Sequence, residues 1–241
     1  MKTTMILTLT SLLILVGCIK ETPCTRGEGN IEEVNMSMEA FNSVILQGSM
    51  DVEIAYGVTQ SVTAIGHRNI IDELETRVKD GVWTINLGQG CFTDFDLKIY
   101  ITIPELAMVK NSGSGNITVK DVATPDTFTA EANGSGGTLI SSLTGPSVIR
   151  IILGGVGPIE FENACPGVEQ LFVTNTGAST FHGFPMQVPA CSVTLSGNGH
   201  CEVYASKTLD VTILGSGNVY YKGHPEINIE DSGSGKLISK N

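Results

Sequence analysis

A pair of glycines separated by one residue recurs through the second half of the chain, and this repeat restricts the fold more than any other feature. The first glycines of successive pairs are 18 to 22 residues apart. A period near this length with strand-like flanks is typical of a solenoid, in which each repeat forms one coil and stacks on the next. The seven positions are Gly113-Ser114-Gly115, Gly134-Ser135-Gly136, Gly155-Val156-Gly157, Gly177-Ala178-Ser179, Gly197-Asn198-Gly199, Gly215-Ser216-Gly217 and Gly233-Ser234-Gly235.

Side-chain type stays constant when the repeats are aligned on their first glycine. The columns six before, four before and four after this glycine are apolar apart from Thr138, and the odd offsets are mostly polar. Offsets that differ by two correspond to one face of a strand, so each column points into a shared core. We therefore predict an all-β solenoid of parallel coils with about 18–22 residues per coil. The column four before the glycine holds Val109, Ala130, Ile151, Val173, Val193, Val211 and Ile229.

The glycines themselves are predicted to form the corners between two strands of a coil. A turn that needs positive φ at a crowded ridge excludes a Cβ atom, which is the physical reason to expect glycine there. Gly177-Ala178-Ser179 lacks the second glycine. We expect this corner to be the most strained or to turn differently.

Residues 39–106 show the same alternation with less regular spacing, and we interpret them as irregular first coils. Residues 107–241 form the regular repeats, so that 39–241 is one elongated unit. The first coils are interrupted by an excursion over 70–80, in which residues 72–75 are a candidate for one helical turn. Asp80-Gly81 between Val78 and Val82 is a hairpin turn signal.

The N-terminus is typical of a bacterial lipoprotein. Lys2 precedes an apolar stretch over 6–16, which is long enough for a signal peptide and too short to span a bilayer. Leu15-Val16-Gly17-Cys18 resembles the lipobox, in which the cysteine receives a diacylglycerol. Residues 1–17 are then the signal peptide and Cys18 is the lipidation site. The alternative is an ordinary secretory signal that happens to contain a cysteine.

The residues after Cys18 bear on localisation. Ile19 stands where lipoproteins retained in the inner membrane carry Asp, so we expect an outer membrane lipoprotein, either periplasmic or surface-exposed. Ile19-Lys20-Glu21 is loosely similar to a surface-export signal of Bacteroidetes lipoproteins. Residues 18–38 are polar without periodicity, and we predict a flexible tether there.

A series of short motifs resembles the family called putative auto-transporter adhesin, head GIN domain. The resemblance runs from about residue 39 to the C-terminus and rests on the order of Phe41-Asn42-Ser43-Val44, Gly48-Ser49-Met50-Asp51-Val52, Val78-Lys79-Asp80-Gly81, Ile103-Pro104-Glu105-Leu106 and Gly113-Ser114-Gly115-Asn116. The resemblance implies a right-handed parallel β-helix-like solenoid and an adhesin role in Bacteroidetes lipoproteins. It brings no catalytic residues and no cofactor.

Composition and cysteine usage narrow the function further. Lys and Arg number 14 against 25 Asp and Glu, and the formal charge of −11 argues against nucleic-acid binding. Cys191 and Cys201 fall in inward columns, and we expect them to be buried free thiols. A link between Cys24 and Cys91 has no register argument behind it, and the pairing of Cys24, Cys91 and Cys165 stays open.

The column five after the corner contains a candidate metal or acid–base site. Glu160, His182 and Glu202 are expected to stack on successive coils, with His200 close to Glu202. Carboxylate and imidazole groups at this spacing are suited to a transition metal or to proton transfer. The alternative, which we prefer, is a solvated polar face with no metal, no catalytic residue and no cofactor.

A calcium-binding roll and a polysaccharide-acting enzyme are the alternatives to a binding role for a solenoid. A calcium-binding roll is rejected because Ile117, Ile159 and Val219 stand where its aspartates would be. A polysaccharide-acting β-helix enzyme needs paired carboxylates, and only Asp94 and Asp96 are spaced to share one strand face. We therefore expect a lipid-anchored cell-envelope binding or structural module, whose candidate partners are the membrane, a glycan or a surface protein. The enzyme is the alternative.

Overall fold

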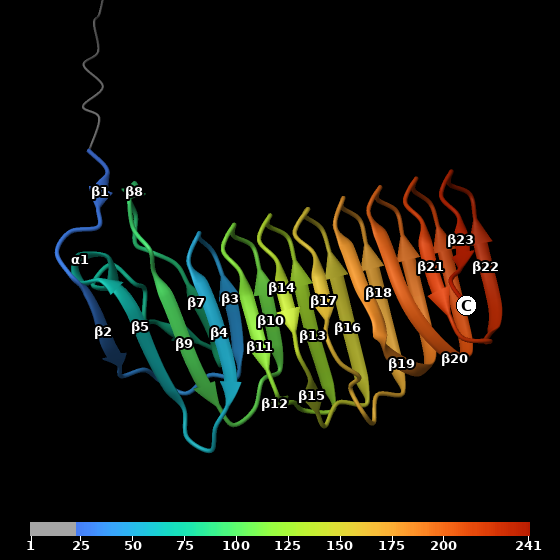
Figure 1. Cartoon of the computed structure of the whole chain (residues 1–241), viewed down its shortest axis with the longest axis horizontal. Coiled ribbons are helices and arrows are strands. Elements are labelled where there is room, and N and C mark those ends of the chain that lie inside the picture. Colours follow the sequence, from blue (N-terminus) through green and yellow to red (C-terminus); the bar gives the residue numbers. More distant parts are fainter. Residues whose placement is uncertain (1–22) are drawn as a thin grey trace, which may run out of the picture.

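The computed structural model describes residues 23–241 and confirms the predicted solenoid of stacked parallel coils (Figure 1). The solenoid has about six turns. The helical content of the described residues is one short helix, α1 (Arg68–Ile71), at the N-terminal end of the stack. No helix in this part of the chain is long and apolar enough to cross a membrane.

Each regular coil contains one strand that leads into the glycine corner and one that leaves it. The strands that lead in form the pre-corner sheet, and those that leave form the post-corner sheet. In the pre-corner sheet these are β10 (Met108–Asn111), β13 (Thr127–Ala132), β16 (Val148–Leu153), β18 (Gln170–Asn175) and β22 (Glu226–Asp231). In the post-corner sheet they are β11 (Ile117–Lys120), β14 (Thr138–Ile140), β17 (Ile159–Phe161), β21 (Val219–Lys222) and β23 (Leu237–Ser239).

The coils are closed on the side away from the corners in two ways. The short strands β12 (Val122–Ala123) and β15 (Leu143–Thr144) pair with each other in the earlier coils. In the later coils β19 (Thr180–Leu195) and β20 (His200–Ile213) run without a break from one corner to the next. Each therefore contributes to the post-corner sheet first and to the pre-corner sheet afterwards.

The predicted inward columns form the core. Val109, Val173 and Val193 are each at most 1% exposed, and the register pairs Val193 with Val173 on one side and Val211 on the other. The last coil is the exception, because Ile229 is 44% exposed. No further coil of the described chain stacks on it.

The corner glycines are required by close backbone packing and not by positive φ, so our conformational argument for them was wrong. Their φ angles lie outside the left-handed region, whereas Gly145 and Gly223 elsewhere have φ of 109° and 93°. A Cβ on Gly115 would lie 1.9 Å from the Met50 carbonyl oxygen, and one on Gly217 would lie 1.7 Å from that of Gly199. At these glycines the coils stack too closely to admit a Cβ atom.

The corner at Gly177-Ala178-Ser179 turns with a different hydrogen-bond pattern, as predicted. At other corners the amide of the third residue donates to the first glycine of the preceding corner, as Gly199 N does to Gly177 O at 3.1 Å. Among the described residues, the Ser179 amide lacks this bond. The buried Ser179 hydroxyl instead donates to the Gly157 carbonyl oxygen.

Two buried asparagines brace the corners, a feature that the sequence analysis missed. The Asn111 side-chain amide donates to the Gly115 and Gly137 carbonyl oxygens at 2.9 and 3.1 Å, and its Oδ1 accepts from the Gly113 amide. Asn175 makes the equivalent bonds within its own corner. Both side chains are fully buried, and their amide groups satisfy backbone groups that would otherwise lack partners.

The first coils are not stacked in chain order, which corrects our simple reading of residues 39–106. The coil of β3 (Ser43–Leu46) and β4 (Asp51–Tyr56) lies between two later segments. On one side are β7 (Val82–Ile85) and β9 (Lys98–Ile103), and on the other are β10 and β11. The chain therefore passes from β9 across the first coil before the regular repeats begin.

The N-terminal end of the solenoid is closed by antiparallel strands. β5 (Ser61–His67) pairs antiparallel with β9, and β2 (Ile31–Met36) pairs antiparallel with β5. The predicted flexible tether over 18–38 is therefore wrong for residues 31–36. Its strand was hidden because it lies at the sheet edge, where Glu32 and Glu33 are exposed and weaken the apolar alternation.

The excursion over 70–80 contains one correct and one incorrect prediction. The Asp80-Gly81 turn joins β6 (Val78–Lys79) to β7, with φ of 52° and 74° at the two residues. The helical turn is at 68–71 and not at 72–75, because Ile70 and Ile71 anchor it in the core.

Candidate functional site

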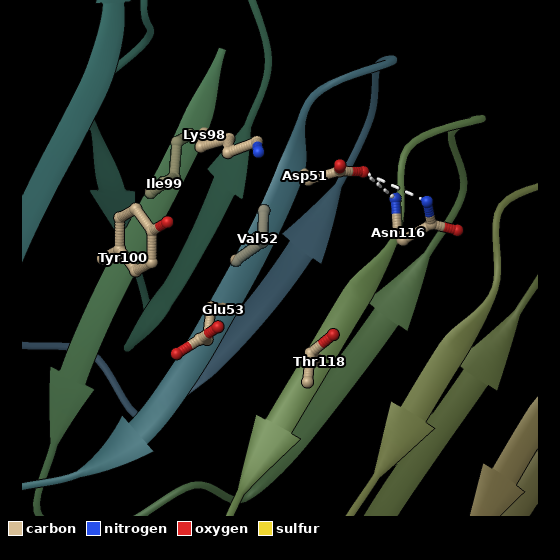
Figure 2. Close-up of a pocket in the computed structure, with 8 residues that line it drawn as sticks. All are labelled: Asp51, Val52, Glu53, Lys98, Ile99, Tyr100, Asn116 and Thr118. Carbon is tan, nitrogen blue, oxygen red and sulfur yellow. Dashed lines mark hydrogen bonds between the residues drawn. The ribbon is translucent and has the colours of Figure 1, made fainter. Parts of the chain in front are cut away.

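A groove of about 300 Å³ lies on the outer surface of the post-corner sheet, over β9, β4 and β11 (Figure 2). Alternate residues of these strands project from the sheet because their neighbours fill the core. The groove is thus a direct product of stacking β4 between β9 and β11. It is lined by Asp51, Val52, Glu53, Lys98, Ile99, Tyr100, Asn116 and Thr118.

Hydrogen bonds fix the upper edge of this groove. Asp51 Oδ1 accepts from the Asn116 backbone amide at 3.0 Å and from the Asn116 side-chain amide at 3.1 Å. Asn116 Oδ1 in turn accepts from the Gly137 amide at 3.0 Å. The chain of bonds crosses three successive coils and holds two polar side chains in defined positions.

The floor of the groove carries side chains that are free to meet a ligand. Figure 2 shows the Lys98 amine extending from β9 toward Asp51, and the Tyr100 ring lying on the outer surface of β9. Tyr100 is 40% exposed. Glu53 forms an ion pair with Lys120 at 2.8 Å between Oε2 and Nζ, and both side chains remain in contact with solvent.

A second hollow of about 320 Å³ continues the first one along the stack. Asn116 and Thr118 line both hollows, and the second is bounded farther on by Leu139, Pro158 and Glu160. We call the two together the post-corner groove. It crosses five neighbouring strands, β9, β4, β11, β14 and β17.

The predicted column of Glu160, His182 and Glu202 has the expected register, because β17, β19 and β20 pair these residues in order. His182 Nδ1 lies 2.9 Å from Glu202 Oε2, and the two side chains are 41% and 28% exposed. Within residues 23–241, no three His, Cys, Asp or Glu side chains are grouped closely enough to hold a metal ion. The arrangement is a partly exposed pair rather than a three-ligand cluster.

The other predicted histidine interacts with the following coil. His200 Nδ1 accepts from the Asn218 amide at 3.0 Å, and its ring packs edge-to-face on Tyr220 at 5.8 Å between centroids. His200 is thus hydrogen-bonded to Asn218 and not to Glu202.

Two cysteine predictions are resolved by the structure. Cys24 and Cys91 form a disulfide beside the two-stranded pair of β1 (Thr25–Arg26) and β8 (Phe92–Thr93). Cys165, Cys191 and Cys201 are free and buried. The thiol prediction for Cys191 and Cys201 is therefore confirmed, while Cys18 lies outside the described residues.

Burial controls the chemistry of the free thiols. It raises the pKa of Cys201 to about 12, against the smaller lowering effect of the hydrogen bond from Asn175. Burial, followed by the nearby Cys201 and Asp210, raises the pKa of Cys191 still further, and burial also raises that of Cys165. Because the thiolate is the reactive form, these groups are inert at neutral pH.

The Asp94 and Asp96 pair does not share one strand face, which corrects the geometric basis considered for an enzyme. β8 ends at Thr93, and Asp94 has a φ of 53° outside any strand. Asp94 instead forms an ion pair with Arg26 at 2.7 Å. Asp51 and Glu53 on β4, in contrast, do share one strand face.

Sequence reasoning overlooked the residues of the post-corner groove. Asp51 and Glu53 alternate with the apolar Val52 and Ile54, so their outward orientation was readable. Their proximity to Lys98 and Tyr100 was not, because those residues follow on β9 and stack on the N-terminal side of β4.

The fold and groove define a parallel β-solenoid with an acidic, polar ligand-sized depression on one sheet. Residues 40–225 match the family described as "Putative auto-transporter adhesin, head GIN domain", and the chain belongs to this family. Its members are adhesin-type domains, which places the chain among cell-surface or envelope proteins. The resemblance that the sequence motifs indicated is thereby confirmed.

Solved structures with the same fold come from Bacteroidetes. A "putative adhesin" of Bacteroides fragilis superposes with a TM-score of 0.82 at 20% identity, covering 89% of this chain and 99% of its own. One from Parabacteroides merdae has a TM-score of 0.67 at 18% identity, with coverage of 91% and 100%. A "putative lipid binding protein" of Parabacteroides distasonis has a TM-score of 0.60 at 20% identity, with coverage of 91% and 100%. At these identities the likeness establishes the fold alone, and no curated protein matches the chain.

Proposed function

We propose that this protein is a lipid-anchored, surface-exposed binding module that holds a neutral glycan in the post-corner groove. The observation that carries the proposal is the groove itself, whose two adjoining hollows share Asn116 and Thr118 and together cross five strands. An elongated depression of this kind fits a chain-like ligand better than a compact one. Solenoids commonly present extended binding surfaces of this type.

The lining of the groove matches the chemistry of sugars. Hydroxyl groups of a glycan both donate and accept hydrogen bonds, and the groove offers carboxylates, an amide, an amine and the Thr118 hydroxyl. Tyr100 adds a partly exposed ring whose flat face suits the apolar face of a sugar ring. Polar groups for orientation and one aromatic surface for contact area are the usual components of such sites.

The charged residues of the groove indicate which class of glycan it binds. Three carboxylates, Asp51, Glu53 and Glu160, line the groove, against the amine of Lys98 in the lining and that of Lys120, which pairs with Glu53. The whole chain has a formal charge of −11. An acidic glycan or a nucleic acid would be repelled, so a neutral glycan is the favoured class.

A lipid at Cys18 would hold the module close to the membrane. Only residues 19–23 separate Cys18 from the disulfide-bonded Cys24. Six residues span at most about 20 Å when fully extended. In this arrangement the N-terminal end of the solenoid stays near the outer membrane surface and the stack of coils carries the groove.

The binding proposal is tested by screening the full chain against immobilised neutral and acidic glycans. We expect binding to neutral glycans, and at least tenfold weaker binding by Tyr100→Ala, because exposed aromatic residues dominate such contacts. Tyr56→Ala is the matched control, since Tyr56 lies on neighbouring β4, is 53% exposed and does not line the groove. Exclusive binding to acidic glycans, or equal losses in the two variants, would contradict the proposal.

The anchor is tested separately by Cys18→Ser. We expect the variant to move from the membrane fraction to the soluble fraction and to lose palmitate labelling. Continued labelling and sedimentation with membranes would show that Cys18 is not the lipidation site. Because this experiment measures only lipidation and membrane attachment, a negative result would not contradict the glycan proposal.

A further inference from the structure

The C-terminal end of the solenoid presents an unpaired coil. Among the described residues, β22 pairs with β20 alone and β23 pairs with β21 alone, so each has one free edge. The inward residues Ile227 and Ile229 on β22 are 39% and 44% exposed. The opposite end is closed by β2, β5 and α1 (Figure 1).

We propose that two copies of the chain associate end to end through this coil, with β22 of each copy pairing antiparallel with β23 of the other. Free strand edges next to exposed apolar side chains are templates for pairing with another chain. A second copy would continue both sheets and cover Ile227, Ile229 and Leu237 with the same residues of its partner. An identical coil of a second copy is therefore the partner that pairs the free backbone groups of both strand edges and covers the exposed apolar side chains at the same time.

The directions of the strands fit a twofold interface. β22 runs toward the Gly233 corner and β23 runs away from it. A twofold axis parallel to these strands exchanges the two sheets, so that β22 of one copy lies antiparallel to β23 of the other. The same operation keeps the inward residues facing a common core, as an isologous interface requires.

Charge complementarity favours this pairing over the alternatives. Glu230 lies three residues before Gly233 and Lys236 lies three residues after it, so the two are equally far from Gly233 along the chain. Glu226 and Lys240 are related in the same way at seven residues. Antiparallel neighbours that lie directly opposite each other are close enough for opposite charges to attract.

The acidic side chains of β22 are available for these contacts. Within residues 23–241, neither Glu226 nor Glu230 forms an ion pair. The Lys240 Nζ lies 4.9 Å from the centroid of the Tyr220 ring on β21, so it has to leave that ring to pair with Glu226 of a second copy. Pairing of β22 with β22 would instead place acidic residues against acidic residues, which is unfavourable.

The interface is expected to be weak and reversible. Each copy buries only the end of one coil, which is less than the roughly 800 Å² per partner of a standard stable interface. Dimer formation should therefore depend on protein concentration. High salt should weaken it, because the ion pairs lie at the surface.

Sedimentation velocity of the full chain carrying Cys18→Ser tests the proposal without a contribution from the lipid. We expect the wild-type end to give a concentration-dependent dimer. Glu226→Lys with Glu230→Lys, and separately Lys236→Glu with Lys240→Glu, should each raise the dissociation constant at least tenfold. An equimolar mixture of the two double variants should restore the dimer, because every opposed pair is again of opposite charge.

The mixing step separates a specific interface from general charge effects. A wild-type chain that stays monomeric at every concentration would overturn the proposal, and so would a dimer that ignores the swaps or fails to reappear on mixing. Far-UV circular dichroism and a thermal melt check that each variant folds. If a swap prevents folding, Glu226→Gln with Glu230→Gln should still fold and weaken the dimer.

Discussion

At the scale of single residues, the fold depends on backbone groups that approach each other more closely than side chains allow. The corner glycines have ordinary φ angles and are selected by contact with the preceding coil. The buried asparagines Asn111 and Asn175 then satisfy the amides and carbonyls of those corners. Steric exclusion and hydrogen bonding thus determine which residue types the corners can contain.

Gly217→Ala is predicted to destabilise the chain by about 1–3 kcal/mol or more, because the new Cβ would lie 1.7 Å from the Gly199 carbonyl oxygen and overpack the ridge. Gly137→Ala is the matched control, since its Cβ would meet Asn116 Oδ1 at an ordinary 3.5 Å. Urea denaturation of the two variants gives the comparison. Equal free energies of unfolding would contradict the close-packing account.

The three buried thiols predict a loss of stability at alkaline pH. Their pKa values are raised in the folded state, so folding favours the protonated form. The contribution of the thiols to the free energy of unfolding should be constant below about pH 8.5, the ordinary thiol pKa, and fall above it. Cys201→Ala should reduce the slope, as measured by urea denaturation across this range. An unchanged slope would show that Cys201 does not titrate differently on unfolding.

At the scale of the strand, the alternation of inward and outward residues specifies the register. Val193 lies between Val173 and Val211 and is 1% exposed, while the next residue, Thr194, faces outward. A shift of one residue along the strand would therefore move each core side chain to the solvent-facing side.

Val193→Asp is predicted to unfold the C-terminal coils, because an unpaired buried carboxylate costs at least several kcal/mol, comparable with the total stability. Thr194→Asp should change stability by less than about 0.5 kcal/mol. Thermal melts of both variants provide the test. Similar melting temperatures would mean that the strand is not in the observed register.

The column of Glu160, His182 and Glu202 is predicted to be dispensable for folding. Its one ion pair is about a third exposed, and such pairs contribute less than about 1 kcal/mol. Changing all three residues to Gln should leave the far-UV spectrum and melting temperature nearly unchanged.

The same two proteins test the column for metal binding. Zinc or nickel should raise the melting temperature of neither protein. A dose-dependent rise in the wild type that vanishes in the triple variant would establish a metal site at this face.

The sequence predicted the repeating part of the fold because each coil carries the same apolar columns and the same glycine ridge. It could not order the first coils, because β3, β7 and β10 have similar alternation and any two could be neighbours. It missed β2, whose exposed edge carries Glu32 and Glu33. The groove was hidden for the same reason as the coil order, since it forms only where β4 lies between β9 and β11.

At the scale of the whole molecule, the ends and the sides of the solenoid have different roles. The N-terminal end is closed by antiparallel strands and held by the Cys24–Cys91 disulfide beside the proposed anchor. Within residues 23–241, β22 and β23 at the C-terminal end each have one unpaired edge. The side of the post-corner sheet carries the groove, which is well separated from the exposed Ile227 and Ile229.

We propose that this protein binds its partner in the post-corner groove, and a crystal structure of the full chain with a neutral oligosaccharide from the glycan screen tests this most directly. We predict electron density for the sugar over β9, β4 and β11, in contact with Tyr100 and Thr118 and continuing toward Glu160. Density over the pre-corner sheet or at the β22 and β23 end, with the groove empty, would contradict the account.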